Sequence, residues 1–337
     1  HPMVEFDRLD FANWPLYIDK KVIKDFEKEF GAKVKYVEEI NDNEEFFGKV
    51  RQPLAAGNDI KRDIVVLTDW MAARMVRLNY VQAIDKKNIP NAKNLQQTLA
   101  SPKWDPKREF SLPWQSGMTA IGYDKKRVGR EIGSLEDMFD PKFKGRVSMF
   151  SDAREAANFM ILRAGKRPED ATIDDVLAAI EEVDKINRDG QIRRFTGNDY
   201  TTELTKGNVW IAQAYSGDMV QLKADNTDLD FVIPEQGATI WTDNMQIPVS
   251  SKNQYAAETM MNYVYDPEVA AKLAAYVNYV TPVVGAREAL EASDPELAAN
   301  ELIFPSDETL AKLHPYVDLN EEEEKRMNEA MQAVVGA

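Results

Sequence analysis

The stretch Asp63-Ile64-Val65-Val66-Leu67 decides the fold. Its four consecutive apolar residues, three of them β-branched, are typical of a strand that is buried on both faces. Strand and helix patterns alternate around it. In chain order the predicted elements are the strand Leu9–Asn13, the helix Ile18–Phe30, the strand Val34–Val37, the helix Glu44–Ala56, the buried strand itself and the helix Trp70–Leu78. This β-α-β-α-β order predicts a parallel sheet with helices packed on it.

A second group of strands and helices follows, and the end of the chain is largely helical. The predicted strands are 119–123, 146–150, 209–214, 229–233 and 244–249, and the predicted helices are 153–164, 173–188, 200–206, 254–265, 267–276, 286–292, 307–311 and 321–335. Since no low-complexity linker separates the groups, we expect an α/β protein of two lobes joined by crossing strands. One lobe is predicted to comprise 1–117 and 245–289, and the other 118–244 and 290–337, with the C-terminal helices able to pack on either.

Composition excludes several classes of protein. The 337 residues suit two lobes of ordinary size, and no apolar run is long enough to predict a membrane-spanning helix. The net charge of −15 argues against a nucleic-acid partner, because affinity for phosphate backbones comes from clustered Lys and Arg. Cysteine is absent, which excludes disulfides, thiol catalysis and thiolate metal sites. We expect no cofactor.

The first residues, His1-Pro2-Met3-Val4-Glu5, lack the basic and apolar regions of a signal peptide. A mature secreted chain, a recombinant chain and a cytosolic chain would all begin in this way. A chain that had lost a lipid-anchored cysteine together with its leader would look the same. These first residues therefore do not decide between a secreted and a cytosolic protein.

Unusual side chains gather where the predicted strands end. Ligands of open α/β sheets bind beyond the carboxyl ends of the strands. The candidate binding residues there are Trp14 and Tyr17, then Thr68, Asp69 and Trp70, then Asp152 and Glu155, then Tyr215 and Asp218, and finally Trp241 and Asp243. Aromatic rings provide apolar walls and attract an ammonium group, and a buried ammonium must be paired with carboxylates. The combination predicts a site for a small cation.

The segment Asp152-Ala153-Arg154-Glu155 has a purely structural interpretation as well. Asp152 is well placed as the N-cap of a helix, and Glu155 stands at the capping-box position. In the functional interpretation both carboxylates face the ligand, and Arg154 orients one of them or points to solvent. The same pair could in principle serve a glycosidase.

The sequence offers few other motifs for catalysis. His1 and His314 are the only histidines, so a Ser-His-Asp triad would have to use His314. There is no glycine-rich phosphate loop, and a metal site of histidine or cysteine ligands is effectively excluded.

Seven segments in family order resemble the spermidine/putrescine-binding proteins of bacterial ABC importers. They are Asn13-Trp14 with Tyr17, Asp63–Val66, Thr119–Gly122, Ser151–Glu155, Ser216-Gly217, Trp241–Asp243 and Tyr279–Pro282. The resemblance covers almost the whole chain and implies a type II periplasmic-binding-protein fold, in which two lobes close over the ligand. It also implies a polyamine ligand, a membrane permease as partner, a monomer, and a location in the periplasm or on the outer face of the cell membrane, with or without a lipid anchor.

The resemblance also assigns roles to side chains. Trp241 and Tyr17 would sandwich the methylene chain of the ligand, and Asp243 would bind one amine. Asp152 and Glu155 would engage amine groups farther along the ligand. Trp14 and Tyr279 also match residues that line the ligand cleft in the family. Thr68 and Trp70 occupy two further cleft positions, where the family has a Ser and a Tyr.

Several residues differ from the family pattern, so the resemblance does not identify the ligand. Pro15 and Leu16 replace polar residues, Tyr215 replaces a tryptophan, and Asp218 adds an acid near the end that Asp243 would serve. Gln115-Ser116 also differs from a more apolar family segment. Putrescine, agmatine or an ω-amino acid such as γ-aminobutyrate would fit these changes. For a zwitterion, Arg154 or hydroxyl groups would hold the carboxylate, and a paired-carboxylate hydrolase is the remaining alternative.

Overall fold

The computed structural model describes residues 5–336. Most of the leading segment considered above, His1 to Val4, and Ala337 lie outside this range. The chain forms two compact units. The first unit contains the described part of His1–Ser116 together with Thr242–Phe304, and the second contains Gly117–Trp241 and the described part of Pro305–Ala337. The chain thus changes unit after 116, 241 and 304, where the sequence predicts changes after 117, 244 and 289.

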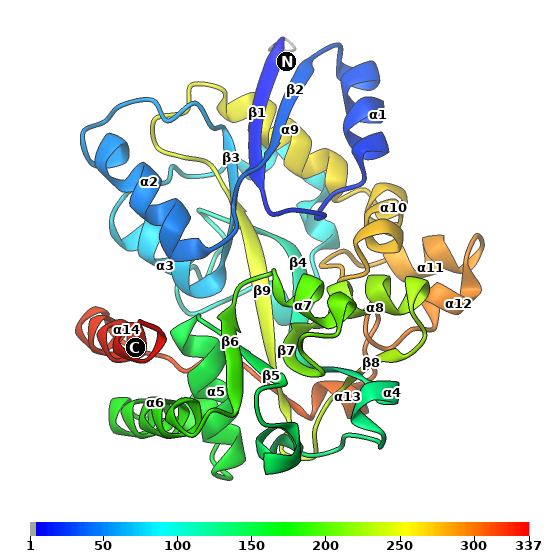
Figure 1. Ribbon diagram of the computed structural model, residues 1–337. Coiled ribbons are helices and arrows are strands. Elements are labelled where there is room, and N and C mark those ends of the chain that lie inside the picture. Colours follow the sequence, from blue (N-terminus) through cyan, green and yellow to red (C-terminus); the bar gives the residue numbers. More distant parts are fainter. Residues whose placement is uncertain (1–4, 337) are drawn as a thin grey trace. The chain divides into compact units, whose positions relative to one another are not determined.

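The first unit is built on a sheet of strand order β2-β1-β3-β9 (Figure 1). Its strands are β1 (Arg8–Asn13), β2 (Lys33–Glu38), β3 (Ile64–Thr68) and the part of β9 (Ala238–Gln246) that begins at Thr242. β1 runs parallel to β2 and β3, as predicted, whereas β9 runs antiparallel to β3. All five residues of β3 are buried, which agrees with its apolar sequence.

Helices cover both faces of this sheet. They are α1 (Lys20–Phe30), α2 (Asn43–Ala55), α3 (Asp69–Arg77), α9 (Gln254–Val264), α10 (Pro267–Val277), α11 (Ala286–Glu291) and α12 (Pro295–Ala298). Short 3-10 turns occupy Lys86–Asn88, Pro90–Asn94 and Gln97–Leu99. On one face α2 and α3 pack over Val65 and Leu67 (Figure 1). α1 packs against α9, where the rings of Phe26 and Tyr263 are 5.4 Å apart.

The first helix begins at Lys20 and not at Ile18, because Asp19 is its N-cap and accepts a hydrogen bond from the backbone N–H of Lys21. It ends at Phe30, as predicted, and its C-cap Gly31 has a φ of 67°, a left-handed conformation that glycine adopts without a steric penalty.

The second unit has a sheet of order β4-β7-β5-β6, with β8 beside β4 and β10 beside β9. Its strands are β4 (Leu112–Asp124, from Gly117 onward), β5 (Val147–Phe150), β6 (Ile192–Thr196), β7 (Ile211–Tyr215), β8 (Leu229–Val232), the start of β9 and β10 (Leu313–His314). β5 is parallel to β6 and β7, whereas β4 is antiparallel to β7 and β8.

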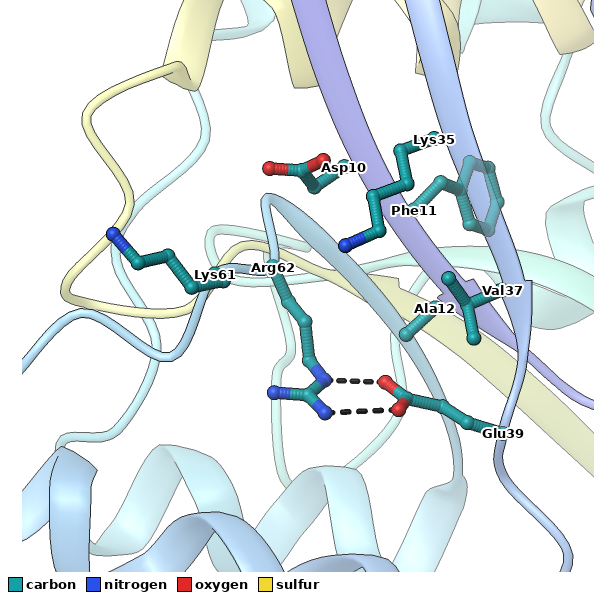
Figure 2. Close-up of a pocket in the computed structure, with 8 residues that line it drawn as sticks. All are labelled: Asp10, Phe11, Ala12, Lys35, Val37, Glu39, Lys61 and Arg62. Carbon is teal, nitrogen blue, oxygen red and sulfur yellow. Dashed lines mark hydrogen bonds and ion pairs between the residues drawn. The ribbon is translucent and has the colours of Figure 1, made fainter.

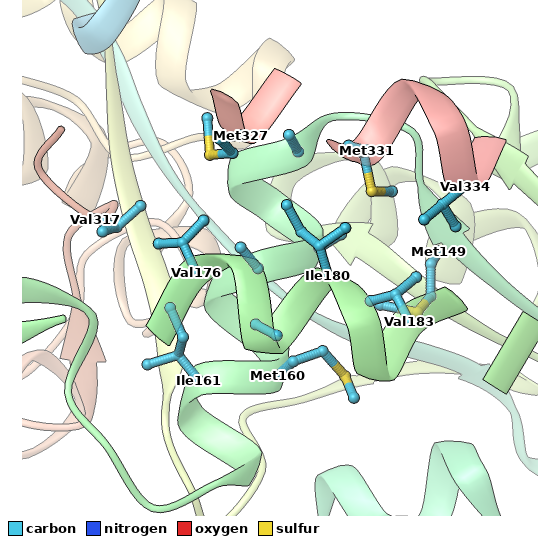
Figure 3. Packing of buried hydrophobic residues seen from close by; sticks show 14 of the residues in the cluster. Met149, Met160, Ile161, Val176, Ile180, Val183, Val317, Met327, Met331 and Val334 are labelled. Atoms are coloured by element: carbon cyan, nitrogen blue, oxygen red, sulfur yellow. The ribbon is translucent and has the colours of Figure 1, made fainter. Parts of the chain in front are cut away.

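The predicted helices of the second unit are confirmed to within one residue at each end. The helices of this unit are α4 (Lys125–Val128), α5 (Ala153–Arg163), α6 (Ile173–Arg188), α7 (Tyr200–Lys206), α8 (Ser216–Asp225), α13 (Asp307–Leu310) and α14 (Glu321–Val335), with 3-10 turns at Leu135–Phe139, Pro141–Phe143 and Pro168–Asp170. α14 packs against α5 and α6. Met327 and Met331 of α14 face Ile180 and Val183 of α6 in one apolar core (Figure 3).

One predicted strand has the wrong bounds, and several elements were not predicted. The strand predicted for 244–249 is β9, Ala238–Gln246, because its pairing with β3 sets the register from Asp243 opposite Thr68 to Gln246 opposite Val65. The elements that were not predicted are the strands β6 and β10 and the helices α4, α8 and α12. The strand sequence Ile-Arg-Arg-Phe-Thr carries two central arginines, and only its pairing with β5 makes it a strand.

Candidate ligand-binding site

The carboxylate of Asp243 is the centre of a buried polar group in the first unit. It lies on β9 opposite the last residue of β3, and only 5% of the residue is exposed. The hydroxyl of Tyr17 donates to Oδ2 at 2.8 Å, and the hydroxyl of Thr68 donates to Oδ1 at 2.8 Å. Thr68 is held in turn by Asn43, whose Nδ2 donates to its Oγ1 at 2.9 Å. Both oxygens of Asp243 therefore have fixed directions.

Burial controls the charge of this group. Loss of hydration, with a smaller contribution from the charge of Asp69, raises the pKa of Asp243 to about 7 against the lowering effect of the hydrogen bonds from Thr68 and Tyr17. The pKa of Asp69 is raised to about 6, chiefly by burial. A carboxylate with these neighbours gains most from a cation that enters beside it.

Aromatic side chains surround this group in the first unit. The ring of Tyr17 meets the ring of Tyr279 edge-on at 5.3 Å between centroids. Trp114, which the sequence did not indicate, donates from Nε1 to the carbonyl oxygen of Tyr17 at 3.2 Å and fixes the first turn. Trp14 donates from Nε1 to the carbonyl oxygen of Val66 at 2.9 Å and is half-buried.

Trp70 stands at the start of α3, under the guanidinium of Arg74 at 5.5 Å from the ring centroid. This ring therefore already contacts a cation of the protein itself.

The second unit contains a separate acidic group around α5. Asp152 is the N-cap of this helix and accepts from the backbone N–H groups of Arg154 and Glu155, so the structural interpretation of Asp152 is correct. The capping-box interpretation of Glu155 is wrong. Its carboxylate accepts hydrogen bonds from the hydroxyls of Thr119, at 3.0 Å, and of Tyr316.

Trp241 joins the same group. Its Nε1 donates to Oγ1 of Thr119 at 3.0 Å, and its ring meets Tyr215 edge-on at 5.5 Å. Glu155, Thr119 and Trp241 are therefore linked through one hydroxyl. Burial and the neighbouring Glu155 raise the pKa of Tyr316 well above its usual value, which keeps this phenol a hydrogen-bond donor.

Asp218 also lies in the second unit, at the first turn of α8. The hydroxyl of Tyr200 donates to its Oδ2 at 2.8 Å, and the same hydroxyl accepts from the backbone N–H of Tyr215 at 2.9 Å. Tyr200 thus fixes Asp218 and Tyr215 together.

The predictions for Arg154 need a correction. Its side chain does not point to solvent, because only 3% of it is exposed. Its Nη2 lies 2.8 Å from Oε2 of Glu324 on α14, whose side chain is 6% exposed. This buried ion pair connects the helix that carries Asp152 and Glu155 to the C-terminal helix.

The predicted site residues thus form two sets. Trp14, Tyr17, Thr68, Asp69, Trp70, Asp243 and Tyr279 belong to the first unit, and Asp152, Glu155, Tyr215, Asp218 and Trp241 to the second. Sequence reasoning missed Tyr316, Thr119, Asn43, Tyr200 and Trp114, which hold these residues in place. Only Thr119 stood in a segment with a family resemblance.

A different hollow lies on the surface of the first unit, against β1 and β2 (Figure 2). It holds about 350 Å³ of empty space, part of which is open solvent, and is lined by Asp10, Phe11, Ala12, Lys35, Val37, Glu39, Lys61 and Arg62. Arg62 and Glu39 form a bidentate ion pair within it. Three of its five charged side chains are cations, so its charge does not suit an ammonium ligand. Within the described range, 5–336, no cluster of three or more His, Cys, Asp or Glu could hold a metal ion.

Residues 21–305 match the family described as bacterial extracellular solute-binding protein. The chain belongs to this family. The spermidine/putrescine-binding periplasmic protein of Salmonella typhimurium is 28% identical over 91% of this chain and 85% of its own length. The putrescine/cadaverine-binding protein of Pseudomonas aeruginosa is 29% identical over 96% of this chain and 92% of its own length. The resemblance noted from the sequence is therefore confirmed.

Solved structures are similar to this chain over almost its whole length. One from Listeria monocytogenes aligns over 98% of this chain and 99% of its own, with a TM-score of 0.87 and 28% identity. The spermidine/putrescine ABC transporter substrate-binding protein of Streptococcus pneumoniae aligns over 98% of both chains, with a TM-score of 0.81 and 25% identity. The predicted α/β fold of the two-lobed periplasmic-binding-protein type is confirmed by these matches.

Proposed function

We propose that this protein is an extracytoplasmic solute-binding protein that captures a polyamine of the putrescine and spermidine class and delivers it to an ABC importer. The observation that carries the proposal is the buried carboxylate of Asp243, held by the hydroxyls of Tyr17 and Thr68. No Lys or Arg within the described part of the first unit is ion-paired with it. An acid that is oriented, dehydrated and without a counter-ion attracts a small cation.

The ligand's ammonium would donate to Asp243 and restore the hydrogen bonding that burial removes. The rings of Tyr17 and Tyr279 would pack on the methylene groups next to it, and Trp241 with Tyr215 would do the same from the second unit. Asp152 and Glu155 would take further amine groups of the ligand. Contacts from both units would make the ligand-bound arrangement the more stable one, which is how a solute-binding protein closes.

A polyamine is favoured over a zwitterion by the state of Arg154. A γ-aminobutyrate carboxylate would need a cation, and Arg154 is committed to Glu324 by a buried ion pair. Breaking such a pair is strongly unfavourable. Apart from Arg154, the predicted site contains no lysine or arginine, whereas it holds five acids.

The test is isothermal titration calorimetry with putrescine, spermidine, spermine, agmatine and γ-aminobutyrate, and with maltose as a negative control. One or two polyamines should bind, and Asp243→Asn should weaken their binding by about 2–5 kcal/mol. Binding of γ-aminobutyrate alone would replace the polyamine with a zwitterion. If every amine fails to bind the wild type, the proposal is refuted.

We further propose that the protein works as a monomer outside the cytoplasmic membrane, with or without a lipid anchor, and acts on neither nucleic acids nor chemical bonds. Its partner would be a membrane permease. Curated relatives are named periplasmic proteins, and none of the helices in residues 5–336 is long and apolar enough to cross a membrane. Light scattering of the purified protein tests the monomer. Turnover of a chromogenic glycoside that is lost in Glu155→Gln would contradict the absence of catalysis.

A further inference from the structure

Residues 315–317, between β10 and α14 of the second unit, carry the phenol of Tyr316 that donates to Glu155. These three residues belong to no helix or strand, so no regular ladder of backbone hydrogen bonds fixes them. Pro315 is exposed and has no N–H group to donate. The direction of the Tyr316 side chain must therefore be set by another part of the unit.

Asn158 on α5 holds this segment. It lies one turn after Glu155 on the same helix and is completely buried. Its Nδ2 donates to the carbonyl oxygen of Pro315 at 3.1 Å, and its Oδ1 accepts from the backbone N–H of Val317 at 3.2 Å. Nδ2 also donates to Oγ1 of Thr239 on β9 at 3.2 Å. Both polar atoms of this amide are therefore used inside the unit.

The two backbone groups that Asn158 binds belong to the peptide bonds on either side of Tyr316. The carbonyl group of Pro315 lies in the bond before Tyr316, and the N–H group of Val317 lies in the bond after it. Because each peptide group is planar, fixing both leaves φ and ψ of Tyr316 little freedom. One amide thus fixes the direction in which the phenol leaves the backbone.

The side chain of Val317 anchors the same segment in a different way. It is 3% exposed and lies in one apolar core with Ile161 and Val176 (Figure 3). Apolar contacts are non-directional, so they keep the segment near α5 without orienting its peptide groups. Hydrogen bonds depend on the angle at the donor, so the orientation is left to Asn158.

The influence of Tyr316 extends beyond Glu155. Oε1 of Glu155 accepts from the hydroxyls of both Tyr316 and Thr119. Oγ1 of Thr119 accepts in turn from Nε1 of Trp241 at 3.0 Å. All of these residues belong to the second unit, so the side chain of Trp241 is connected by hydrogen bonds to the segment that Asn158 holds.

We propose that Asn158 is a positioning residue of the ligand-binding site: its amide binds the peptide groups on both sides of Tyr316 and thereby holds the carboxylate of Glu155 and the ring of Trp241 in place for the ligand. Asn158 acts through Tyr316 and does not touch the ligand. The effect on affinity rests on the proposed function, whereas the hold on Tyr316 is a property of the ligand-free protein.

The experiment is a double-mutant cycle, in which calorimetry measures the affinity of the full chain for putrescine and for spermidine. Tyr316→Phe alone should weaken binding about tenfold or more. Asn158→Ala alone should weaken it by more than about threefold, and the double variant should bind within about twofold of Tyr316→Phe, because Asn158 acts only through the phenol. A loss below about threefold in Asn158→Ala would overturn the proposal, as would losses that multiply in the double variant.

Two further variants guard against a general loss of structure. Asn262→Ala removes a similar bond in the first unit, where Oδ1 of Asn262 accepts from the backbone N–H of Asn91 at 2.8 Å, and it should bind like the wild type. If it binds as weakly as Asn158→Ala, the effect is general and the proposal fails. Asn158→Asp keeps an acceptor for Val317 but has no N–H for the carbonyl oxygen of Pro315. It should weaken binding in the same way, and it takes the place of Asn158→Ala in the cycle if circular dichroism shows that the alanine variant does not fold.

A measurement without ligand separates this inference from the proposed function. The indole Nε1–H group of Trp241 gives a proton–nitrogen NMR signal, which is identified by its loss in Trp241→Phe. Asn158→Ala should shift this signal in the same direction as Tyr316→Phe, because both variants remove the hold of the phenol on Glu155. If the signal shifts in this way but no polyamine binds the wild type, the positioning by Asn158 stands and the ligand class is wrong. A signal that stays in place in Asn158→Ala refutes the positioning role whatever the ligand is.

Discussion

Replacement of Asp243 by Asn should make the ligand-free protein more stable near neutral pH, even though it abolishes tight binding. In the folded protein the pKa of Asp243 is about 7, and its ordinary value is 3.8. A raised pKa contributes stability that is present below the ordinary value and is lost as pH rises through the folded value. One unit of pKa corresponds to about 1.4 kcal/mol. Between pH 4.5 and pH 8 the wild type should therefore lose about 3 kcal/mol that the Asn variant does not lose.

The assay is urea unfolding of both proteins at pH 4.5 and pH 8, with the difference between variant and wild type as the quantity compared. All other carboxyl groups titrate alike in the two proteins and cancel in this difference. Asn keeps an oxygen that can accept from Thr68 or Tyr17, so the packing changes little. A difference that stays the same at both pH values would refute the reasoning, because Asp243 would then titrate alike in the folded and unfolded chains.

Glu39→Gln is the matched control with the opposite sign. The hydrogen bonds from Arg62 hold the pKa of Glu39 below its usual value. A lowered pKa contributes stability above the ordinary value that is lost as pH falls. Glu39→Gln should thus destabilise the protein at pH 8 and have a smaller effect at low pH.

Three further substitutions test the supporting residues. Glu324→Gln removes the anion of the buried ion pair with Arg154, and should lower the free energy of unfolding by about 3 kcal/mol in urea titration. Tyr316→Phe removes a donor to Glu155, and should weaken polyamine binding by about 1.5–3 kcal/mol in calorimetry. Leu16→Gly should raise the free energy of unfolding by about 1 kcal/mol, because Leu16 has a φ of 56° that disfavours any residue with a side chain.

Each of these three predictions would be contradicted by a specific result. Equal stability of wild type and Glu324→Gln would mean that the ion pair is not dehydrated. Unchanged affinity in Tyr316→Phe, with the exposed Tyr276→Phe as control, would remove Tyr316 from the site. A less stable Leu16→Gly would show that packing of this side chain outweighs its backbone strain.

Much of the fold could be predicted from short stretches of the sequence. The run Ile64–Leu67 predicted a fully buried strand because a parallel strand covered on both faces has no polar side. The helix Ile173–Arg188 has the bounds that its sequence predicted, and its start is fixed by a capping box of Thr172 and Asp175. These signals act over a few residues and can be read without knowing the rest of the molecule.

The bounds of the strands β6 and β9 could not be predicted from such short stretches of sequence. The two arginines of β6 favour no strand by themselves, and pairing with β5 decides the matter. Trp241 and Asp243 were placed before a strand, yet both lie inside β9, because β3 extends the pairing to Asp243. Strand register is a long-range property and is settled by partners far away in sequence.

The sequence by itself determined that this is an acidic α/β protein with aromatic and carboxylate side chains near the ends of several of its strands, and it identified the family. Only the tertiary structure decided how those side chains are held and charged. Thr68 and Tyr17 orient Asp243, Arg154 pairs with Glu324, and Asn158 binds the peptide groups beside Tyr316. Dehydration and hydrogen-bond geometry set the charge of a carboxyl group, and both arise from atoms that the fold brings together across distances the sequence does not record.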